Sequence, residues 1–434
     1  MNILDIIAKK RDNKELSKQE IEYFINEYTS GNITDYQAAA LIMAIYINGM
    51  TNEETKNLTL SMAYSGEVLD LAYIGENIID KHSTGGVGDK ITLILMPIIA
   101  SLGIPVAKMS GRGLGYTGGT ADKLEAIPGY NINISTDDFI NNVNKIGISL
   151  ISQNMSLAPV DKKIYALRDT ISCIGSIPLI VSSIMSKKIA SGANKLVLDV
   201  TVGNGTFMND LLSAKQLAQA MIDIGRLSEK ETVCVLTNMD EPLGKTVGNI
   251  LEVKEAVKSL QGDIEEDVKE VVLELGAQMI KLDGKNSDIE ENKKMILEAI
   301  LSGKAYEKFI ELVENQGGDI SYLKDLNKFK KANYIYKVKS KDDGYVQKLN
   351  ARTIGEVARD LGAGRLKKED SIDYEAGIVL NKKVGDKVSI GEVLAEIHTN
   401  KEHIIKEAET RILNSYKIIG EEVSKKKNIL GVME

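Results

Sequence analysis

Two glycine-rich segments, at residues 81–89 and 108–125, constrain the fold of this chain more than any other feature. Each follows an apolar run with strand character and precedes a run with helical character. A strand, a loop and a helix that recur in this order predict a mostly parallel sheet covered by helices. Ligands bind to such sheets beyond the carboxyl ends of the strands, where both segments are expected to lie.

Both segments carry groups suited to binding an anion. Glycine lets backbone N–H groups approach a ligand closely and turn with positive φ. Serine and threonine add hydroxyl donors, lysine adds positive charge, and the N-terminus of a following helix attracts anions. Two such loops on neighbouring strands would surround one phosphate from two sides. The residues predicted to bind it are Lys81, His82, Ser83, Thr92, Lys108, Met109, Ser110 and Thr120.

A structural turn is the alternative for the first segment, because a short glycine motif alone indicates either kind of loop about equally. The second segment favours the anion site. Its spacing matches neither the P-loop nor the dinucleotide-binding pattern. It nevertheless holds more glycines than an ordinary turn needs, namely Gly111, Gly113, Gly115, Gly118 and Gly119.

His82 is one of three histidines in the chain. A lone histidine is more often structural than catalytic, but one inside an anion loop is placed to act on a bound ligand. A phosphate dianion beside it would favour the imidazolium, which is ready to act as a general acid. With two further histidines distant in sequence and only two cysteines, the chain shows no zinc-binding pattern.

A chain of 434 residues is long enough for two or three domains. Its net charge of −8 argues against a nucleic-acid-binding protein, so an anion site must be built from local groups. Cys173 and Cys234 lie in apolar contexts and are expected to be buried and reduced, as in a cytoplasmic protein. No signal peptide or membrane span is visible, since the apolar run at 91–102 is too short to cross a bilayer.

The expected fold class is α/β with three domains. Residues 1–70 contain helix-capping boxes and no proline, which predicts a helical domain. Residues 71–335 alternate strands and helices and predict a central α/β domain with a mostly parallel sheet, and residues 336–434 predict a C-terminal α+β domain of short strands. The charged helices at 248–315 are expected to form a solvated outer layer. Pro97 must either kink its helix or begin a new one.

Two further polar clusters occupy residues 157–169 and 177–188. Arg168 offers a planar fork of hydrogen-bond donors, and Ser183 and Lys187 are i, i+4 neighbours if their segment is a helix. Taken alone, such residues are more often surface charges on helices than parts of a site.

The string from Ser110 to Glu125 closely resembles the signature of the thymidine and pyrimidine-nucleoside phosphorylase family. Residues 81–89, 157–169 and 183–187 resemble the same family in the same order, and the resemblance covers essentially the whole chain. It implies reversible phosphorolysis of uridine, thymidine or deoxyuridine to the free base and (deoxy)ribose 1-phosphate. It also implies a homodimer that uses no organic cofactor. In each subunit, a segment near 160–192 would belong to the same domain as the N-terminal helices.

The resemblance also implies roles for individual residues. His82, Arg168 and Lys187 would stabilise negative charge on the leaving base while phosphate attacks C1′ directly. Ser183 would bind the base with Arg168 and Lys187. Phe207 resembles a position that packs near the base, although a core residue is an equal alternative. Because the base and the phosphate are expected on different domains, closure would bring the reactants together.

The bacterial pyrimidine branch of the family often binds a potassium ion. The matching position 90 usually carries a hydroxyl residue, whereas this chain has lysine. A lysine ammonium cannot ligate a cation, but it can occupy the place of the ion and pair with Glu255. Ion binding is therefore expected to be weakened or replaced. The residues at the matching positions are Gly88, Lys90, Leu243, Thr246 and Glu255.

Other readings remain open at this level. A thymidine-restricted phosphorylase is a variant of the leading one, and Tyr116, which stands where relatives usually carry histidine, is expected to tune loop closure. An anthranilate phosphoribosyltransferase-like enzyme would need acidic pairs for magnesium and a diphosphate site, and no Asp-Glu pair is clearly placed for them. The strands near 377–398 vaguely resemble a biotinyl or lipoyl carrier domain, but the Met-Lys pair of such carriers is missing.

Overall fold

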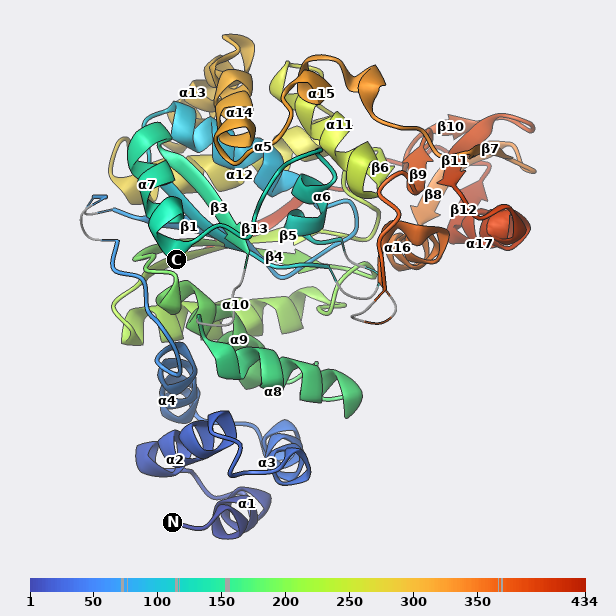
Figure 1. The fold of residues 1–434 in the computed structure, drawn as a ribbon. Coiled ribbons are helices and arrows are strands. Elements are labelled where there is room, and N and C mark those ends of the chain that lie inside the picture. Colours follow the sequence, from blue (N-terminus) through green and yellow to red (C-terminus); the bar gives the residue numbers. More distant parts are fainter. Residues whose placement is uncertain are drawn as a thin grey trace.

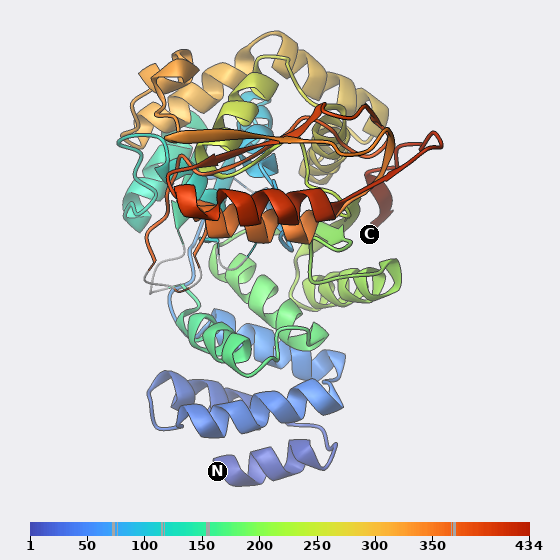
Figure 2. The same cartoon turned by 90° about the vertical axis from the view of Figure 1, so that its right-hand side faces the viewer.

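The computed structural model describes residues 1–434 except 72, 73, 76, 114, 115, 117, 153–156, 366, 368 and 369. Leu114, Gly115 and Thr117 of the second glycine-rich segment therefore lie outside the described residues. Figure 1 shows a helical part that holds the N-terminus, a central α/β part, and a smaller part that carries the last helices. In the view turned by 90°, the N-terminal helices lie in layers below the rest of the molecule (Figure 2).

The helical part is assembled from two separate stretches of chain. The predicted capping boxes begin three of its helices, with Ser17, Thr34 and Thr51 as the N-caps. Val160 and Ile164 from the second stretch pack into the same apolar cluster as the first stretch. The helices are α1 (Ile3–Arg11), α2 (Lys18–Thr29), α3 (Asp35–Asn48), α4 (Asn52–Ala63), α8 (Pro159–Thr170) and α9 (Ile177–Ala190).

The central part is built on a six-stranded sheet in the order β13-β5-β4-β1-β2-β3. All neighbouring strands are parallel except β13, which runs antiparallel to β5. In β4, Val197 faces one apolar cluster while Leu196 and Leu198 face another, so the sheet is buried on both sides. The strands are β1 (Ile79–Ser83), β2 (Val106–Ser110), β3 (Ile148–Ser152), β4 (Lys195–Val202), β5 (Glu231–Asn238) and β13 (Ile429–Met433).

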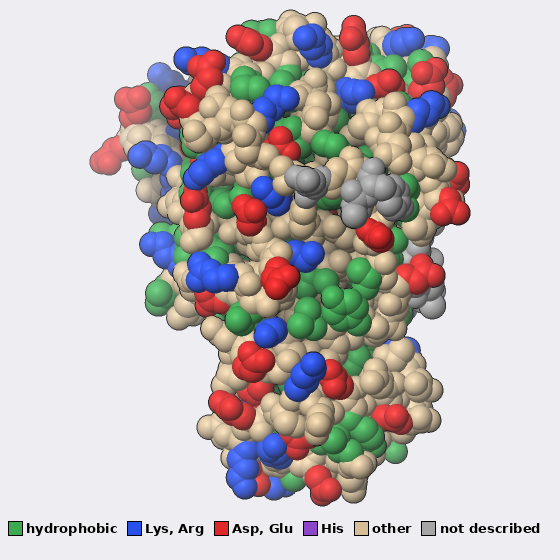
Figure 3. All heavy atoms as spheres, turned by 90° about the vertical axis from the view of Figure 1, so that its left-hand side faces the viewer, with side chains coloured by type: hydrophobic (Ala, Val, Ile, Leu, Met, Phe, Trp, Pro, Cys, Tyr) green, Lys and Arg blue, Asp and Glu red, His purple; other side chains and the backbone are tan. Residues whose placement is uncertain are grey.

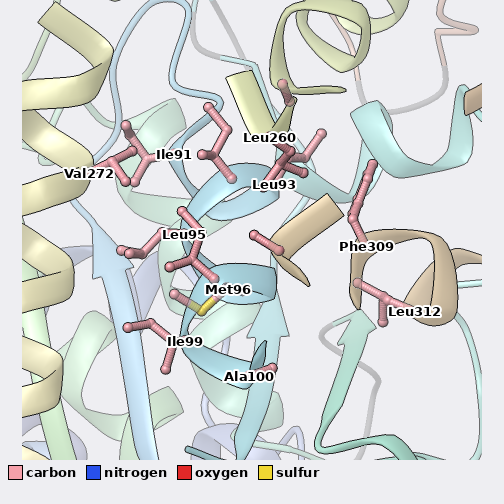
Figure 4. Close-up of a cluster of buried hydrophobic side chains, with 14 of the residues drawn as sticks. Ile91, Leu93, Leu95, Met96, Ile99, Ala100, Leu260, Val272, Phe309 and Leu312 are labelled. Atoms are coloured by element: carbon pink, nitrogen blue, oxygen red, sulfur yellow. The ribbon is translucent and has the colours of Figure 1, made fainter. Parts of the chain in front are cut away.

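Helices cover both faces of this sheet (Figure 1). Residues 91–101 form one helix that contains Pro97, so the alternative of a new helix starting at Pro97 is wrong. Its apolar residues are buried on all sides, as Figure 4 shows. The helices of the central part are α5 (Ile91–Ser101), α6 (Thr120–Glu125), α7 (Thr136–Ile146), α10 (Leu211–Leu227), α11 (Asn249–Leu260), α12 (Glu266–Asp283), α13 (Ile289–Leu301), α14 (Lys304–Asn315), α15 (Ser321–Lys324) and the 3₁₀ turn η1 (Leu326–Lys328).

The expectation of a solvated outer layer at 248–315 is only half right. These helices expose their charged faces, but Val257, Val272 and Phe309 are fully buried in the main core against α5. Apolar residues at helical spacing on a charged helix bury one face and solvate the other, which explains the difference.

The C-terminal part holds two small antiparallel sheets, ordered β10-β8-β12 and β6-β9-β11-β7. The expected fold class is thereby confirmed. The last strand, β13, lies at the end of the expected third domain but pairs with β5 in the central sheet. The remaining elements are β6 (Thr246–Val247), β7 (Tyr334–Lys339), β8 (Gly344–Leu349), α16 (Ala351–Ala358), the π-helical turn η2 (Arg359–Ala363), β9 (Gly377–Leu380), β10 (Lys387–Val388), β11 (Val393–Thr399), the 3₁₀ turn η3 (Glu402–Ile404), α17 (Ile405–Ser415) and β12 (Tyr416–Ile419).

The surface mixes both signs of charge. On the face shown in Figure 3, acidic and basic side chains alternate with apolar ones, and the molecule narrows toward the N-terminal helices. Both cysteines are free and buried, as predicted. Among the described residues, no helix combines the length and the apolar character needed to cross a bilayer.

Candidate active site

The two glycine-rich segments begin at the carboxyl ends of neighbouring parallel strands. Strand β1 pairs with β2 on one side and with β4 on the other. The sequence predicted that β1 and β2, the strands before the two glycine-rich loops, are neighbours. Lys81, His82 and Ser83 therefore lie beside Lys108 and Ser110 at one edge of the sheet. Parallel pairing places these side chains together because the strands end at the same edge.

Lys81 is held in the middle of a buried acidic pair. Its Nζ lies 3.2 Å from Asp199 Oδ2 and 4.0 Å from Asp89 Oδ1, and its side chain is fully buried. Thr237 donates a hydrogen bond of 2.7 Å to the other oxygen of Asp199. Burial alone would lower the pKa of Lys81, but Asp89 and Asp199 raise it above its usual value, so the ammonium stays charged.

Lys108 reaches across from β2 to β1. Its Nζ donates to Lys81 O at 2.5 Å and lies 3.4 Å from Asp80 Oδ1. Burial, helped by the charges of Lys188 and Lys81, lowers the pKa of Lys108 to about 7 against the opposing effect of Asp80. An anion bound here would therefore meet an ammonium that titrates near neutral pH.

Ser110 supplies a hydroxyl that no described residue uses. Its Oγ is buried and has no hydrogen-bond partner in the described part of the chain. A buried hydroxyl without a hydrogen-bond partner is unfavourable, so a ligand that accepts a hydrogen bond from it would be stabilised there.

The remaining predicted phosphate residues differ in what they offer. Thr92 is buried in the first turn of α5, and Thr120 is the first residue of α6. Ser83 Oγ already accepts a hydrogen bond of 3.2 Å from Gly85 N. The side chain of Met109 packs in an apolar cluster with Phe139, so only its main chain faces polar groups, and its carbonyl lies 3.5 Å from Lys188 Nζ.

The surroundings of His82 favour its neutral form in the protein without phosphate. Burial lowers its pKa well below the usual value, and the charges of Lys188, Lys108, Lys187 and Lys81 lower it further. The imidazole is therefore neutral when no anion is bound, and the imidazolium expected beside a phosphate dianion stays a prediction. A dianion placed among these lysines would oppose their effect.

Helices α8 and α9 carry the residues predicted to bind a base. Lys187 Nζ bonds to Ser183 Oγ at 3.0 Å, which confirms that the two side chains share one helix face. Asp161 on α8 accepts a second bond from Lys187 at 2.8 Å through Oδ2, whereas its buried Oδ1 has no described partner. These contacts fix the direction of the Lys187 ammonium.

Arg168 is buried and has a structural task as well. Its guanidinium donates to the carbonyls of Cys173, Ile174 and Leu179 at 2.6–3.3 Å, so it holds the loop between α8 and α9. Since a guanidinium has five N–H groups, two of them remain for a ligand. Burial lowers the pKa of Arg168 below its usual value, against the opposing charge of Asp161, but an arginine still stays charged.

An ion pair connects the residues predicted to bind phosphate with those predicted to bind the base. Lys188, next to Lys187 on α9, lies 2.5 Å from Asp80 Oδ2 on β1, and both side chains are buried. Asp80 thus binds Lys188 through one oxygen and Lys108 through the other. The pair fixes α9 against the strand that carries His82.

The second glycine-rich loop is closed on itself and joined to the first. A Cβ added at Gly119 would come within 2.0 Å of Gly113 N, so only glycine fits at this close approach. Asp122 accepts a bond of 2.7 Å from the same nitrogen. Lys123 Nζ donates to Asp89 O in the first loop at 2.5 Å and lies 2.7 Å from Glu252.

The C-terminal part also touches this loop. Arg365 Nη2 bonds to Asp122 at 2.9 Å, and the Tyr116 ring lies 6.4 Å from the Phe207 ring. Phe207 is 40 % exposed, so the alternative that made it a core residue is wrong. An exposed aromatic ring beside the loop is available to a ligand.

The residues expected around a potassium ion do come together, but around the ammonium of Lys90. Its Nζ donates to the carbonyls of Leu243 and Thr246 and pairs with Glu255. Gly88, with φ of +74°, lies against the carbonyl of Leu243.

Sequence reasoning missed the acidic partners of the lysines. Asp199 lies inside an apolar strand, Asp80 lies in a strand that is polar after Ile79, and Asp161 and Lys188 lie in clusters to which no such contact was assigned. A charged residue inside an apolar strand is rarely buried without a partner. That signal could have identified Asp199 as the partner of a buried cation, but not which cation it pairs with.

Comparison with known proteins places all three parts in one group. Residues 4–66 match the helical bundle domain and residues 75–306 the a/b domain of the glycosyl transferase family. Residues 345–419 match the pyrimidine nucleoside phosphorylase C-terminal domain.

Similar full-length proteins share about half of their residues with this chain. Proteins named pyrimidine-nucleoside phosphorylase from Staphylococcus haemolyticus, Geobacillus stearothermophilus and Bacillus subtilis are 52%, 50% and 50% identical over 404 residues, which is 93% of each chain. Among solved structures, the anthranilate phosphoribosyltransferase from Thermus thermophilus matches with a TM-score of 0.59 and 17% identity. That match covers 72% of this chain and 99% of the other, and shows a shared fold alone.

Proposed function

This chain belongs to the pyrimidine-nucleoside phosphorylase family of pentosyltransferases, and on that premise we propose that it cleaves uridine, thymidine and deoxyuridine by reversible phosphorolysis. Phosphate is the co-substrate, and the products are the free pyrimidine base and (deoxy)ribose 1-phosphate. No organic cofactor enters this reaction. A cytoplasmic location stays a prediction.

One observation carries the assignment of the site. The charges of Lys81, Lys108, Lys187 and Lys188, which come from β1, β2 and α9, all act on His82. Such a gathering of cations around one imidazole, three of them buried, supports a site for a small, highly charged anion. The unpaired hydroxyl of Ser110 at the same edge supports it further.

The proposed chemistry follows from the charges that develop during cleavage. Breaking the glycosidic bond leaves positive charge on the sugar and negative charge on the base. A phosphate held by the two glycine-rich loops stabilises the sugar and attacks C1′ from the opposite side, which inverts that carbon. Arg168, Lys187 and Ser183 bind the base, so they stabilise the charge that it gains.

His82 is proposed to become an acid only when phosphate arrives. Without an anion the lysines keep its imidazole neutral. A phosphate dianion would offset those charges and raise the pKa of His82, so that the imidazolium forms beside the base and donates a proton to its O2. Binding of phosphate and readiness for cleavage are thereby linked.

Movement of one part against another is part of the proposal. The phosphate residues lie on the central sheet, whereas Arg168, Ser183 and Lys187 lie on helices that pack with the N-terminal ones. We divide the chain into three domains: residues 1–70 together with the segment 160–192, the rest of residues 71–335, and residues 336–434. Closure between the first two domains would bring the phosphate within reach of C1′.

A homodimer is proposed as the working form. Helix α3 leaves apolar side chains exposed, among them Tyr36 at 74 % and Ile47 at 71 %. A helix with apolar residues toward solvent favours a protein contact at that face. Sedimentation of the protein would show a species of twice the chain mass if the proposal is right.

Release of free base tests the proposed reaction. The protein is incubated with uridine, thymidine or inosine, each with and without phosphate, and the base is measured by chromatography. Uracil and thymine released only with phosphate would establish phosphorolysis, and the ratio of their rates would separate the broad enzyme from a thymidine-restricted one. Release without phosphate would indicate a hydrolase, and no release would favour the phosphoribosyltransferase alternative.

A further inference from the structure

The ammonium group of Lys90 is enclosed at the start of α5, directly after the first glycine-rich loop. The side chain has no solvent exposure. Its Nζ donates to Leu243 O at 2.6 Å and Thr246 O at 3.2 Å, and lies 3.0 Å from Glu255 Oε2. Two N–H groups of the ammonium thus have carbonyl acceptors, and the carboxylate of Glu255 is its ion-pair partner.

The acceptors form the kind of oxygen shell that holds a small monovalent cation. Two carbonyl oxygens and one carboxylate converge on a single point, which the Lys90 ammonium occupies. The Glu255 carboxylate is held in place, because its oxygens also accept bonds from Lys245 N at 2.9 Å and Thr246 N at 2.8 Å, and from the Thr246 hydroxyl.

The shell is too tight to admit an ion beside the ammonium. A Cβ added at Gly244 would lie 2.7 Å from Lys90 Nζ and 2.1 Å from Glu255 Oε1. A Cβ added at Gly88 would lie 2.6 Å from Leu243 O. Glycine at both positions lets the backbone close around the ammonium. An added Cβ would collide with the ammonium and Glu255 at Gly244, and with a carbonyl of the shell at Gly88.

The carboxylate of the shell already has its counter-charge, because Lys90 pairs with Glu255. The adjacent Asp267 and Glu241 share Lys383, which also donates to Pro242 O at 2.8 Å. Gly244 N donates to the same Asp267 at 2.9 Å, so the two pairs share one loop. A potassium ion at this point would lie directly beside the Lys90 ammonium, and two cations enclosed together repel each other strongly. The residues present do not fit the ion.

We infer that Lys90 is a built-in monovalent cation, which makes this protein independent of potassium. The ammonium ties three segments together: the end of the phosphate loop, the loop at 243–246 and helix α11. The loop at 243–246 leads into β6, which pairs with β9 of the C-terminal part. A tethered charge therefore holds the phosphate loop in place without depending on the salt around the protein.

The first test uses the unaltered protein and does not depend on the proposed reaction. Its melting temperature is measured in potassium, sodium and tetramethylammonium chloride at equal ionic strength. Equal values, within about 1 °C, are expected. A melting temperature that is higher in potassium than in both other salts would overturn the inference, whatever the protein does to nucleosides.

The second test removes the Lys90 ammonium, so that a cation can bind in its place. Lys90→Ser removes the ammonium and leaves a hydroxyl among the same oxygens, so the variant should melt about 5 °C or more below the unaltered protein in tetramethylammonium. Potassium should restore most of the loss. Lys90→Met, which removes the charge and offers no ligand, should not be restored.

Lys245→Ser is the matched control, because it removes one lysine from the same loop. The Lys245 side chain is half exposed and pairs with Glu265 away from the enclosed shell. The melting temperature of Lys245→Ser should be no higher in potassium than in the other two salts. Crystals of Lys90→Ser soaked in rubidium should show anomalous scattering between Leu243 O and Glu255, and unaltered crystals should show none. Rubidium in the unaltered protein, or equal melting of Lys90→Ser in all salts, would contradict the inference.

Discussion

Lys188 on α9 lies 2.5 Å from Asp80 on β1, and both side chains are buried. This ion pair joins the helix that carries Ser183 and Lys187 to the strand that carries His82. The other oxygen of Asp80 lies 3.4 Å from Lys108 of the second strand. One carboxylate therefore contacts both a lysine beside the proposed base site and a lysine of the proposed phosphate site.

Replacing that carboxylate should damage both stability and phosphate binding. In Asp80→Asn, two buried lysines lose their counter-charge, so we expect the melting temperature to fall by about 5 °C or more. The pKa of Lys108, which Asp80 now raises, should fall below 7, and the KM for phosphate should rise about tenfold at pH 7.5. Calorimetry and steady-state kinetics measure the two effects.

Asp12→Asn is the control for this change, because Asp12 pairs with Arg11 on the surface. Exposed pairs contribute little to stability, so its melting temperature and KM should stay unchanged. Unchanged phosphate kinetics in a folded Asp80→Asn protein would show that Asp80 does not position the lysines.

His82 should stay neutral until an anion binds. Its pKa lies well below the usual value, so its ring signals in NMR should not titrate between pH 8 and about pH 6 without phosphate. Saturating phosphate should move the midpoint upward by about one unit or more. The chain has only three histidines, so His82→Asn identifies the signal.

The same variant tests the role of His82 in cleavage. Loss of a general acid should lower kcat about 10²-fold to 10⁴-fold while the protein still binds phosphate. Full turnover by a folded His82→Asn or His82→Ala protein would remove His82 from the mechanism.

Binding of a non-titrating anion should weaken as the pH rises through about 7. The pKa of Lys108 is about 7, so below this pH its ammonium is ready to bind an anion, and above it binding must first recover a proton. Sulfate affinity, measured by calorimetry, should fall by up to tenfold per unit above pH 7. Lys108→Arg should flatten this profile, because arginine stays charged. A flat profile in the unaltered protein would contradict the assignment.

Lys187 should affect the nucleoside far more than the phosphate. Lys187→Met removes the positive charge that, in the proposed mechanism, stabilises the negative charge on the leaving base. We therefore expect kcat/KM for uridine to fall about 10²-fold. The KM for phosphate should change less than about threefold. Lys163→Met, on the exposed face of α8, should leave both constants unchanged. Equal losses for the two substrates would indicate that Lys187 serves the fold rather than the base.

Gly119 should tolerate no side chain. In Gly119→Ala the new Cβ would meet Gly113 N at 2.0 Å, so the second glycine-rich loop must open. We expect loss of most phosphorolysis, with the melting temperature lowered by only a few degrees because the loop lies outside the core. Gly111→Ala, where a Cβ meets nothing within 4 Å, should keep its activity. Similar activity of the two variants would contradict the close-approach argument.

The sequence by itself determined the layers of the fold. Capping boxes located the starts of α2, α3 and α4, and the alternation of strands and helices predicted the central α/β part with its mostly parallel sheet. These signals are local, because a helix cap or a buried strand depends on neighbours in the chain. The two glycine-rich loops followed from the same local pattern. So did the shared helix face of Ser183 and Lys187.

Only the tertiary structure decided which charges meet. No local pattern pairs Asp80 with both Lys108 and Lys188, or Asp199 with Lys81, since these partners are brought together by strand order and helix packing. The same holds for β13, which returns from the end of the chain to pair with β5. The pKa of His82 also depends on these long-range contacts, because burial and four lysines from three elements act on it together. Burial makes each such contact strong, and the fold alone decides what is buried.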